Sequence, residues 1–151
     1  MAKVTPDAEI LEYAIAREVD ANRFYLALAE LTEKPEMRKV FEDLAKEELE
    51  HKAKLELEVM KTGRTVAADE EARGLHTDEE TNIGGAELDM DYKDMLMLAM
   101  EKEEAAFRTY VNLVPSVQDQ ESRDVLLALA EEEVKHKLRF EVEYDMLLKK
   151  S

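Results

Sequence analysis

The chain has 151 residues, a length that suits one domain with a continuous apolar core. Its 37 acidic residues outnumber 21 basic ones, and the net charge of −16 disfavours nucleic acid and anionic membranes as partners because both are polyanions. The absence of cysteine excludes disulfides, cysteine-ligated zinc sites and iron–sulfur clusters. The N-terminus lacks the apolar core of a signal peptide, so we expect a soluble cytoplasmic protein.

Four long segments combine helical periodicity with strong helix formers, and none shows the alternation of a strand. We place these helices at about residues 6–32, 35–62, 89–114 and 118–149. Pro6 and Pro35 suit the first turn of a helix, and Gly63 suits a C-terminal cap. The chain is therefore predicted to be all-α.

The connections predict how these helices are arranged. Short breaks near 33–34 and 115–117 make two antiparallel hairpins, whereas residues 63–88 form a long linker that contains all the glycines. A linker of this size can cross a helix of ~39 Å and start the third helix parallel to the second. We therefore predict one domain, 1–151, built as an antiparallel four-helix bundle with one long crossover. The alternative, two separate hairpins on a disordered tether, would leave the apolar stripes exposed to water.

The two halves of the chain form a repeat. When residues 14–58 are shifted by 85 positions, 17 of 45 residues are identical. Both halves contain Glu-x-x-His, as Glu48 with His51 and as Glu133 with His136. Two similar hairpins around a pseudo-twofold axis would bring these corresponding residues opposite each other.

Each predicted helix carries an apolar stripe with a glutamate near its middle, where a packed bundle normally has an apolar residue. The four glutamates are Glu18, Glu48, Glu103 and Glu133, and His51 and His136 lie on the same stripes. Buried carboxylates cost several kcal/mol each unless they are compensated or protonated. No lysine or arginine lies on the stripes at that level, but two divalent ions would balance four carboxylates. We therefore predict a dinuclear metal site.

The ligand types narrow the choice of metal. Mixed oxygen and nitrogen ligands disfavour calcium and magnesium, and structural zinc usually takes four ligands, often thiolates. Iron or manganese suits six protein ligands best. An inert motif copied by duplication is the alternative, and the position of the glutamates on the apolar stripes argues against it.

The segments "EVDANRFY" (18–25), "EELEH" (47–51), "EEAAFRTY" (103–110) and "EEVKH" (132–136) resemble the ferritin-like di-iron carboxylate superfamily, and most closely its rubrerythrin-like branch. The resemblance covers nearly the whole chain outside 63–88. It implies two bound iron ions, with manganese as an alternative. The implied metal ligands are Glu18, Glu48, His51, Glu103, Glu133 and His136. In the family pattern, Glu48 and Glu133 bridge the ions and the other two glutamates are terminal ligands.

Two features depart from the rubrerythrin pattern. Rubrerythrins usually carry a four-cysteine rubredoxin domain, which this sequence lacks, and they tend to have an extra glutamate where Met100 stands. The symmetric ligand set is similar to the centre of bacterioferritins, which argues against peroxidase chemistry that depends on a ligand shift.

Other residues on the stripes allow two interpretations each. Tyr25 and Tyr110 either hydrogen-bond the ligand carboxylates or fill the core with their hydroxyls paired elsewhere. The run "MLMLAM" (95–100) is more apolar than one stripe requires, so a homodimer through the third helix is plausible.

Together these features predict a di-iron oxidoreductase that reduces H₂O₂ or O₂ with an external electron donor, or that uses Fe²⁺ as donor and acts as a ferroxidase. A role in oxidative stress follows from the resemblance. Iron storage, a di-manganese catalase and a non-enzymatic helical interaction module are the alternatives.

Overall fold

The computed structural model describes residues 6–61 and 91–150. Its elements are α1 (Pro6–Leu31), α2 (Pro35–Lys61), α4 (Tyr92–Leu113), the short 3-10 helix η2 (Val114–Ser116) and α5 (Gln120–Lys150). These two ranges contain no strand, and no helix within them is long and apolar enough to span a membrane. The predicted all-α class is confirmed. Gly63 and the predicted linker 63–88 lie outside the described residues.

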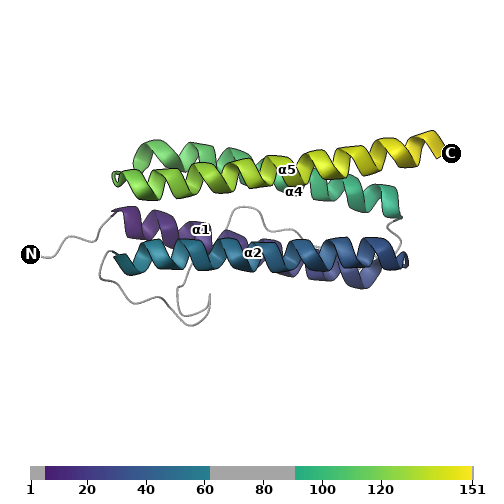
Figure 1. Ribbon diagram of the computed structural model, residues 1–151, viewed down its shortest axis with the longest axis horizontal. Helices are drawn as coiled ribbons and strands as arrows, with labels where there is room; N and C mark the ends of the chain where they lie inside the picture. Colours follow the sequence, from purple (N-terminus) through teal and green to yellow (C-terminus); the bar gives the residue numbers. More distant parts are fainter. Residues whose placement is uncertain (1–5, 62–90, 151) are drawn as a thin grey trace, which may run out of the picture.

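The four long helices form a bundle of two antiparallel hairpins (Figure 1). α1 pairs with α2, and α4 pairs with α5. Across the bundle α1 contacts α4 and α2 contacts α5. Followed along the colour bar, α2 and α4 run in the same direction, and α1 and α5 run in the opposite one (Figure 1). This is the topology that a single crossover between the second and third helices requires, so the predicted ferritin-like arrangement is confirmed.

The helix ends follow from local side chains. α1 and α2 begin at Pro6 and Pro35, as predicted. α4 begins at Tyr92 and not at 89. Asp91 is its N-cap, and the Asp91 carboxylate accepts a hydrogen bond from the Asp94 amide at 2.9 Å. α5 begins at Gln120 instead of 118, because residues 114–116 form the 3-10 helix and Asp119 accepts a hydrogen bond from the Ser122 amide at 3.0 Å.

Two apolar clusters fill the bundle, and each draws residues from all four helices. One is centred on Tyr25, Phe41 and Phe140, and the other on Leu11, Leu55 and Leu126. The layer between the clusters is occupied by the predicted glutamates and histidines. Packed apolar layers therefore enclose this polar layer from both ends of the bundle and keep bulk water away from it.

The run 95–100 divides between core and surface. Met95, Leu96 and Ala99 are buried, whereas Met97 is 45% exposed. The predicted homodimer through this helix stays a prediction.

A buried aspartate joins the start of α1 to the start of α5. The Asp7 carboxylate accepts hydrogen bonds from the backbone amides of Gln118 at 2.8 Å and Asp119 at 2.9 Å. These amides precede α5 and have no intrahelical partner. We expect Asp7→Ala to lower the free energy of unfolding by about 2–4 kcal/mol, because it leaves two amides unsatisfied. Urea denaturation measures the effect. Glu9→Ala, at an exposed position two residues away, is the control and should change stability by less than about 0.5 kcal/mol.

Candidate metal centre

The structure brings all six predicted ligands into one buried layer. α1 supplies Glu18, α2 supplies Glu48 and His51, α4 supplies Glu103, and α5 supplies Glu133 and His136. The glutamates are at most 1% exposed and the histidines 5% exposed. Helical periodicity explains this placement, since each residue lies on the stripe that continues into the apolar clusters above and below.

The imidazole of each histidine faces three carboxylates through its Nδ1 atom. His51 Nδ1 lies 3.4 Å from Glu18, 3.5 Å from Glu48 and 3.8 Å from Glu133. His136 Nδ1 lies 3.4 Å from Glu103, 3.5 Å from Glu133 and 3.7 Å from Glu48. The two rings are nearly parallel, with centroids 6.1 Å apart. The surroundings of His51 and of His136 therefore have the same geometry, with corresponding residues of the two hairpins exchanged.

These distances divide the glutamates into two kinds. Glu48 and Glu133 each lie within 3.8 Å of both Nδ1 atoms. Glu18 approaches only His51, and Glu103 approaches only His136. Two groups of ligand atoms are close enough to hold one metal ion each, Glu18–Glu48–His51 and Glu48–Glu103–Glu133–His136. Because Glu48 belongs to both groups, the two positions share a ligand.

The ligand atoms at this centre lack protein partners. Seven of them are buried and make no hydrogen bond: Glu18 Oε2, both Glu48 oxygens, His51 Nδ1, Glu103 Oε2, Glu133 Oε1 and His136 Nδ1. Buried polar atoms are nearly always satisfied, and carboxylates left in this way cost several kcal/mol. Atoms of four helices that converge without partners fit a pair of cations bound between them.

The burial and mutual repulsion of the carboxylates change their pKa values. Burial raises the pKa of Glu48 well above its ordinary 4.5, and the neighbouring carboxylates of Glu133 and Glu18 raise it further. Burial and then Glu103 raise the pKa of Glu133, although His136 opposes this. Burial lowers the pKa of His136, but the adjacent carboxylates of Glu103 and Glu133 outweigh it and bring the value to about 11. Without a metal, the raised pKa values therefore favour the protonated forms of Glu48, Glu133 and His136.

Tyr25 and Tyr110 hydrogen-bond carboxylates across the bundle. The Tyr25 hydroxyl of α1 donates to Glu103 Oε1 of α4, and the Tyr110 hydroxyl of α4 donates to Glu18 Oε1 of α1. Burial, followed by these carboxylates, raises the pKa of both phenols well above 10, so both remain proton donors. Each tyrosine is therefore a core residue whose hydroxyl also hydrogen-bonds the carboxylate of a predicted ligand.

The carboxylate of Glu47 lies beside the ring nitrogen of His136 that faces away from the predicted ligands. Glu47 of α2 lies with Oε2 3.0 Å from His136 Nε2, on the ring edge opposite the metal cluster. The contact is an ion pair by distance and not a hydrogen bond, because His136 Nε2 makes no hydrogen bond among the described residues. The sequence shows only that Glu47 precedes Glu48, and the contact depends on α2 lying beside α5.

Two buried cations beside the centre were also missed by the sequence analysis. Arg17 is 4% exposed and Lys102 is 7% exposed, and each directly precedes a predicted ligand, Glu18 or Glu103. Lys102 forms an ion pair with Asp20 of α1. They are off the apolar stripes, so periodicity assigns them to the flank of the helix. The shift of 85 residues that relates the two hairpins relates them to each other, which is a signal that could have identified them.

A second acidic group, Glu58 with Asp119 and Glu121, could also hold an ion by distance alone. Here, however, the Glu58 carboxylate accepts hydrogen bonds from Ser122 and Lys61, and Asp119 and Glu121 are exposed. The protein itself satisfies this group, which accounts for it without a metal.

Comparison with known proteins supports the same family. No protein with a curated description matches the sequence. A structure of a hypothetical protein from Pyrococcus furiosus is 28% identical, with a TM-score of 0.72 and coverage of 94% of this chain and 90% of that one. The manganese catalase KatB from Anabaena PCC7120 has a TM-score of 0.72 at 17% identity, covering 97% of this chain and 75% of that one, which shows a shared fold. The Rubrerythrin family matches residues 9–144, nearly the whole chain, and the chain therefore belongs to the rubrerythrin family.

Proposed function

We propose that this protein is a di-iron oxidoreductase of the peroxidase or ferroxidase type. The observation that carries the proposal is the set of seven buried ligand atoms without hydrogen bonds, arranged as two groups that share Glu48. Three carboxylates around each imidazole form the mixed oxygen and nitrogen set that suits iron or manganese. Membership of the rubrerythrin family agrees with this interpretation.

In the proposed centre, Glu48 and Glu133 would be the ligands shared by the two ions, because both lie near both histidines. Glu18 with His51, and Glu103 with His136, would complete the two halves as terminal ligands. Two iron ions bound there would supply two-electron redox chemistry for the reduction of H₂O₂ or O₂, with the electrons restored by an external donor or by Fe²⁺.

The protein contributes orientation and protection around the centre. Tyr25 and Tyr110 hold one oxygen of each terminal carboxylate, which leaves the other oxygen toward the centre. Glu47 places a negative charge beside His136 Nε2. The apolar clusters on either side exclude water and strengthen these interactions. With no cysteine in the sequence, we propose that electrons come from an external donor or from Fe²⁺.

The position of Met100 bears on the type of reaction. The resemblance implies an extra glutamate here in rubrerythrins, but Met100 packs against the apolar core and offers no carboxylate. The ligand set is therefore symmetric. This favours chemistry at a fixed centre, such as ferroxidase activity, over chemistry that requires a ligand to move. It also keeps a di-manganese catalase as a second candidate, consistent with the fold shared with a manganese catalase.

The deciding experiment is metal analysis of the purified protein by mass spectrometry, followed by anaerobic loading with Fe²⁺. About two iron per chain, with rapid oxidation by H₂O₂ or O₂ in stopped-flow absorbance, would support the proposal, and the relative rates would rank the oxidants. Continued oxidation of added Fe²⁺ would identify a ferroxidase. Two manganese and peroxide disproportionation would favour the catalase. Failure to bind any metal would leave a helical interaction module.

A further inference from the structure

The two histidines of the centre differ at the ring nitrogen that faces away from the predicted ligands. His136 Nε2 lies 3.0 Å from a carboxylate oxygen of Glu47 on α2. In the repeat of 85 residues, Glu47 corresponds to Glu132 of α5, and a symmetric structure would place Glu132 beside His51. Among the described residues, however, Glu132 pairs with Lys135 at 3.8 Å and forms no ion pair with His51. The pseudo-twofold symmetry of the centre is therefore broken at this position.

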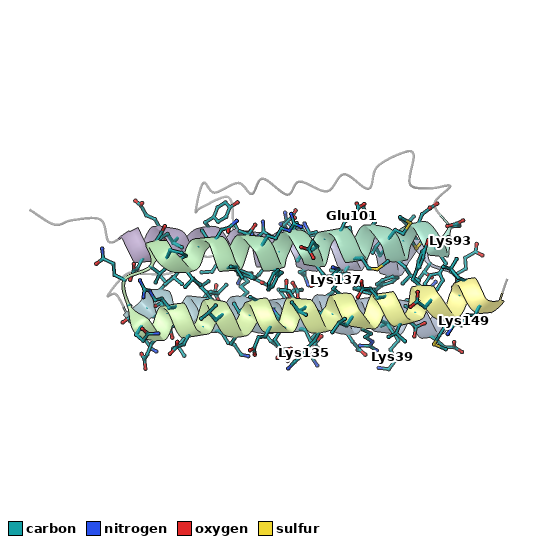
Figure 2. The ribbon with its side chains drawn as sticks, turned by 90° about the horizontal axis from the view of Figure 1, so that it is seen from above. Lys39, Lys93, Glu101, Lys135, Lys137 and Lys149 are labelled. Carbon is teal, nitrogen blue, oxygen red and sulfur yellow. The ribbon has the colours of Figure 1, made fainter. Side chains whose placement is uncertain are left out.

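One difference between the two halves of the sequence accounts for the broken symmetry. The residue three positions after Glu132 is Lys135, whereas the residue three positions after Glu47 is Glu50. Residues at this spacing are neighbours on the surface of a helix. Lys135 points away from the bundle in Figure 2, so its charge draws Glu132 toward the outside of α5. Glu50 instead repels Glu47, which leaves Glu47 to pair with His136 across the helix boundary.

The number of ligand atoms around each histidine differs in the same direction. Four ligand atoms lie within 4.8 Å of one another in the group that contains His136, which also includes Glu48, Glu103 and Glu133. Only three do so in the group that contains His51. Each additional carboxylate near a divalent ion lowers its electrostatic energy. This count, which does not involve Glu47, therefore also favours the position at His136.

The charge of Glu47 acts on the position at His136 through the imidazole. A neutral imidazole that binds a metal ion through Nδ1 must carry its proton on Nε2. The Glu47 carboxylate, 3.0 Å from Nε2, stabilises this tautomer and makes Nδ1 a stronger electron donor to the ion. The Glu47 side chain is 44% exposed, so this interaction requires no additional buried charge. The position at His51 lacks a corresponding carboxylate among the described residues.

We propose that the two metal positions are inequivalent, that the position at His136 binds its ion more tightly, and that Glu47 is the positioning residue responsible for part of this difference. The inference rests on the proposed function, because it concerns the two ions of that centre. The ion at the His51 position would then exchange more readily with Fe²⁺ in solution than the ion at the His136 position.

Cobalt is a suitable probe, because the visible absorption of Co²⁺ reports its coordination by oxygen and nitrogen ligands. Two variants isolate the two positions: His51→Ala retains the position at His136, and His136→Ala retains the position at His51. Titration with Co²⁺ gives the dissociation constant of each position. We expect the constant to be at least about tenfold lower in His51→Ala, the loss that is typical when the partner of a ligating histidine is missing.

Glu47→Gln, made in each of these backgrounds, tests the role of Glu47 directly. In His51→Ala it should raise the dissociation constant for Co²⁺ by about 10- to 100-fold. In His136→Ala the imidazole on which Glu47 acts is absent, so the constant should change by less than about fivefold, as for an exposed charge. A purely structural effect of the substitution would be the same in both backgrounds.

Glu132→Gln is the matched control. It makes the same chemical change at the corresponding position of the repeat, on a side chain that is 39% exposed and pairs with Lys135. It should change the dissociation constant by less than about fivefold in both backgrounds. Stepwise titration of the protein with both histidines is a second measurement: Glu47→Gln should weaken binding of the first Co²⁺ per chain, and Glu132→Gln should not.

The outcomes separate this inference from the proposed function. Circular dichroism of each variant is measured first, so that affinities are compared only between folded proteins. Equal or reversed affinities of His51→Ala and His136→Ala would overturn the inequivalence and leave the dinuclear centre intact. The same holds if Glu47→Gln and Glu132→Gln have equal effects on the first Co²⁺ bound. A wild-type protein that takes up no metal would overturn both.

Discussion

Replacement of Glu48 and Glu133 together by alanine is expected to abolish binding of both metal ions while helix content stays near that of the wild type. These two carboxylates are the ones that lie near both histidines, so their loss removes ligands from both positions at once. The affinity for the metal should fall by more than the 10- to 100-fold loss that is typical when only the hydrogen-bond partner of a metal ligand is removed. Metal analysis after dialysis, together with circular dichroism, measures both quantities.

The helices themselves should persist because the apolar clusters on both sides of the layer are untouched. Glu50→Ala with Glu131→Ala is the matched control, since it removes two glutamates from exposed positions of the same two helices. This control should bind two ions per chain. Two metal equivalents bound by the Glu48/Glu133 variant would show that the ligand assignment is wrong.

The second large effect concerns pH. In the metal-free protein, stability is expected to fall as the pH rises from about 5 to 8. Burial and neighbouring carboxylates raise the folded-state pKa values of Glu48 and Glu133 above the 4.5 of an exposed glutamate. Their contribution to stability is therefore fully present below pH 4.5 and is lost as the pH rises through the folded-state values. His136 acts in the same direction, because its pKa is raised from 6.5 to about 11.

Bound metal should reverse this trend, because the carboxylates must lose their protons to bind the ions and the affinity consequently rises with pH. At neutral pH, free metal at a thousand times its dissociation constant would add about 4 kcal/mol per site, which for a chain of this size is roughly 8–16 °C in Tm. Thermal denaturation at several pH values, with chelator or with metal, tests both signs. Glu48→Gln with Glu133→Gln should flatten the pH dependence of the metal-free protein. A metal-free wild type that is more stable at pH 8 than at pH 5 would contradict the argument.

Periodicity within single helices predicts which residues of this protein are buried together. The alternating steps of three and four residues place Glu18 and Glu103 on apolar stripes, and the same steps place each Glu-x-x-His pair on one face. The stripes must be buried for the bundle to be stable, so the six residues had to meet in the core. The short hairpin breaks and the long linker determined the order and direction of the helices, and the structure agrees.

Contacts between helices could not be predicted from this periodicity. Periodicity assigns a residue to a face of its own helix, but not to the neighbour that this face will meet, nor to its height along that neighbour. The hydrogen bonds from Tyr25 to Glu103 and from Tyr110 to Glu18 depend on both, and their partners are 78 and 92 residues apart. The sequence therefore left the role of the tyrosines open.

Residues at the edges of the stripes are the other group that only the tertiary structure could assign. Lys102 is charged and lies one position from the apolar stripe, so the sequence favours a solvated side chain. Its side chain is buried because Asp20 and Phe24 of α1 pack against it. The sequence by itself determined which residues line the core and which chemistry they share. The packing of four helices decided which charges accompany them there, because burial at the edge of a stripe depends on the neighbouring helix.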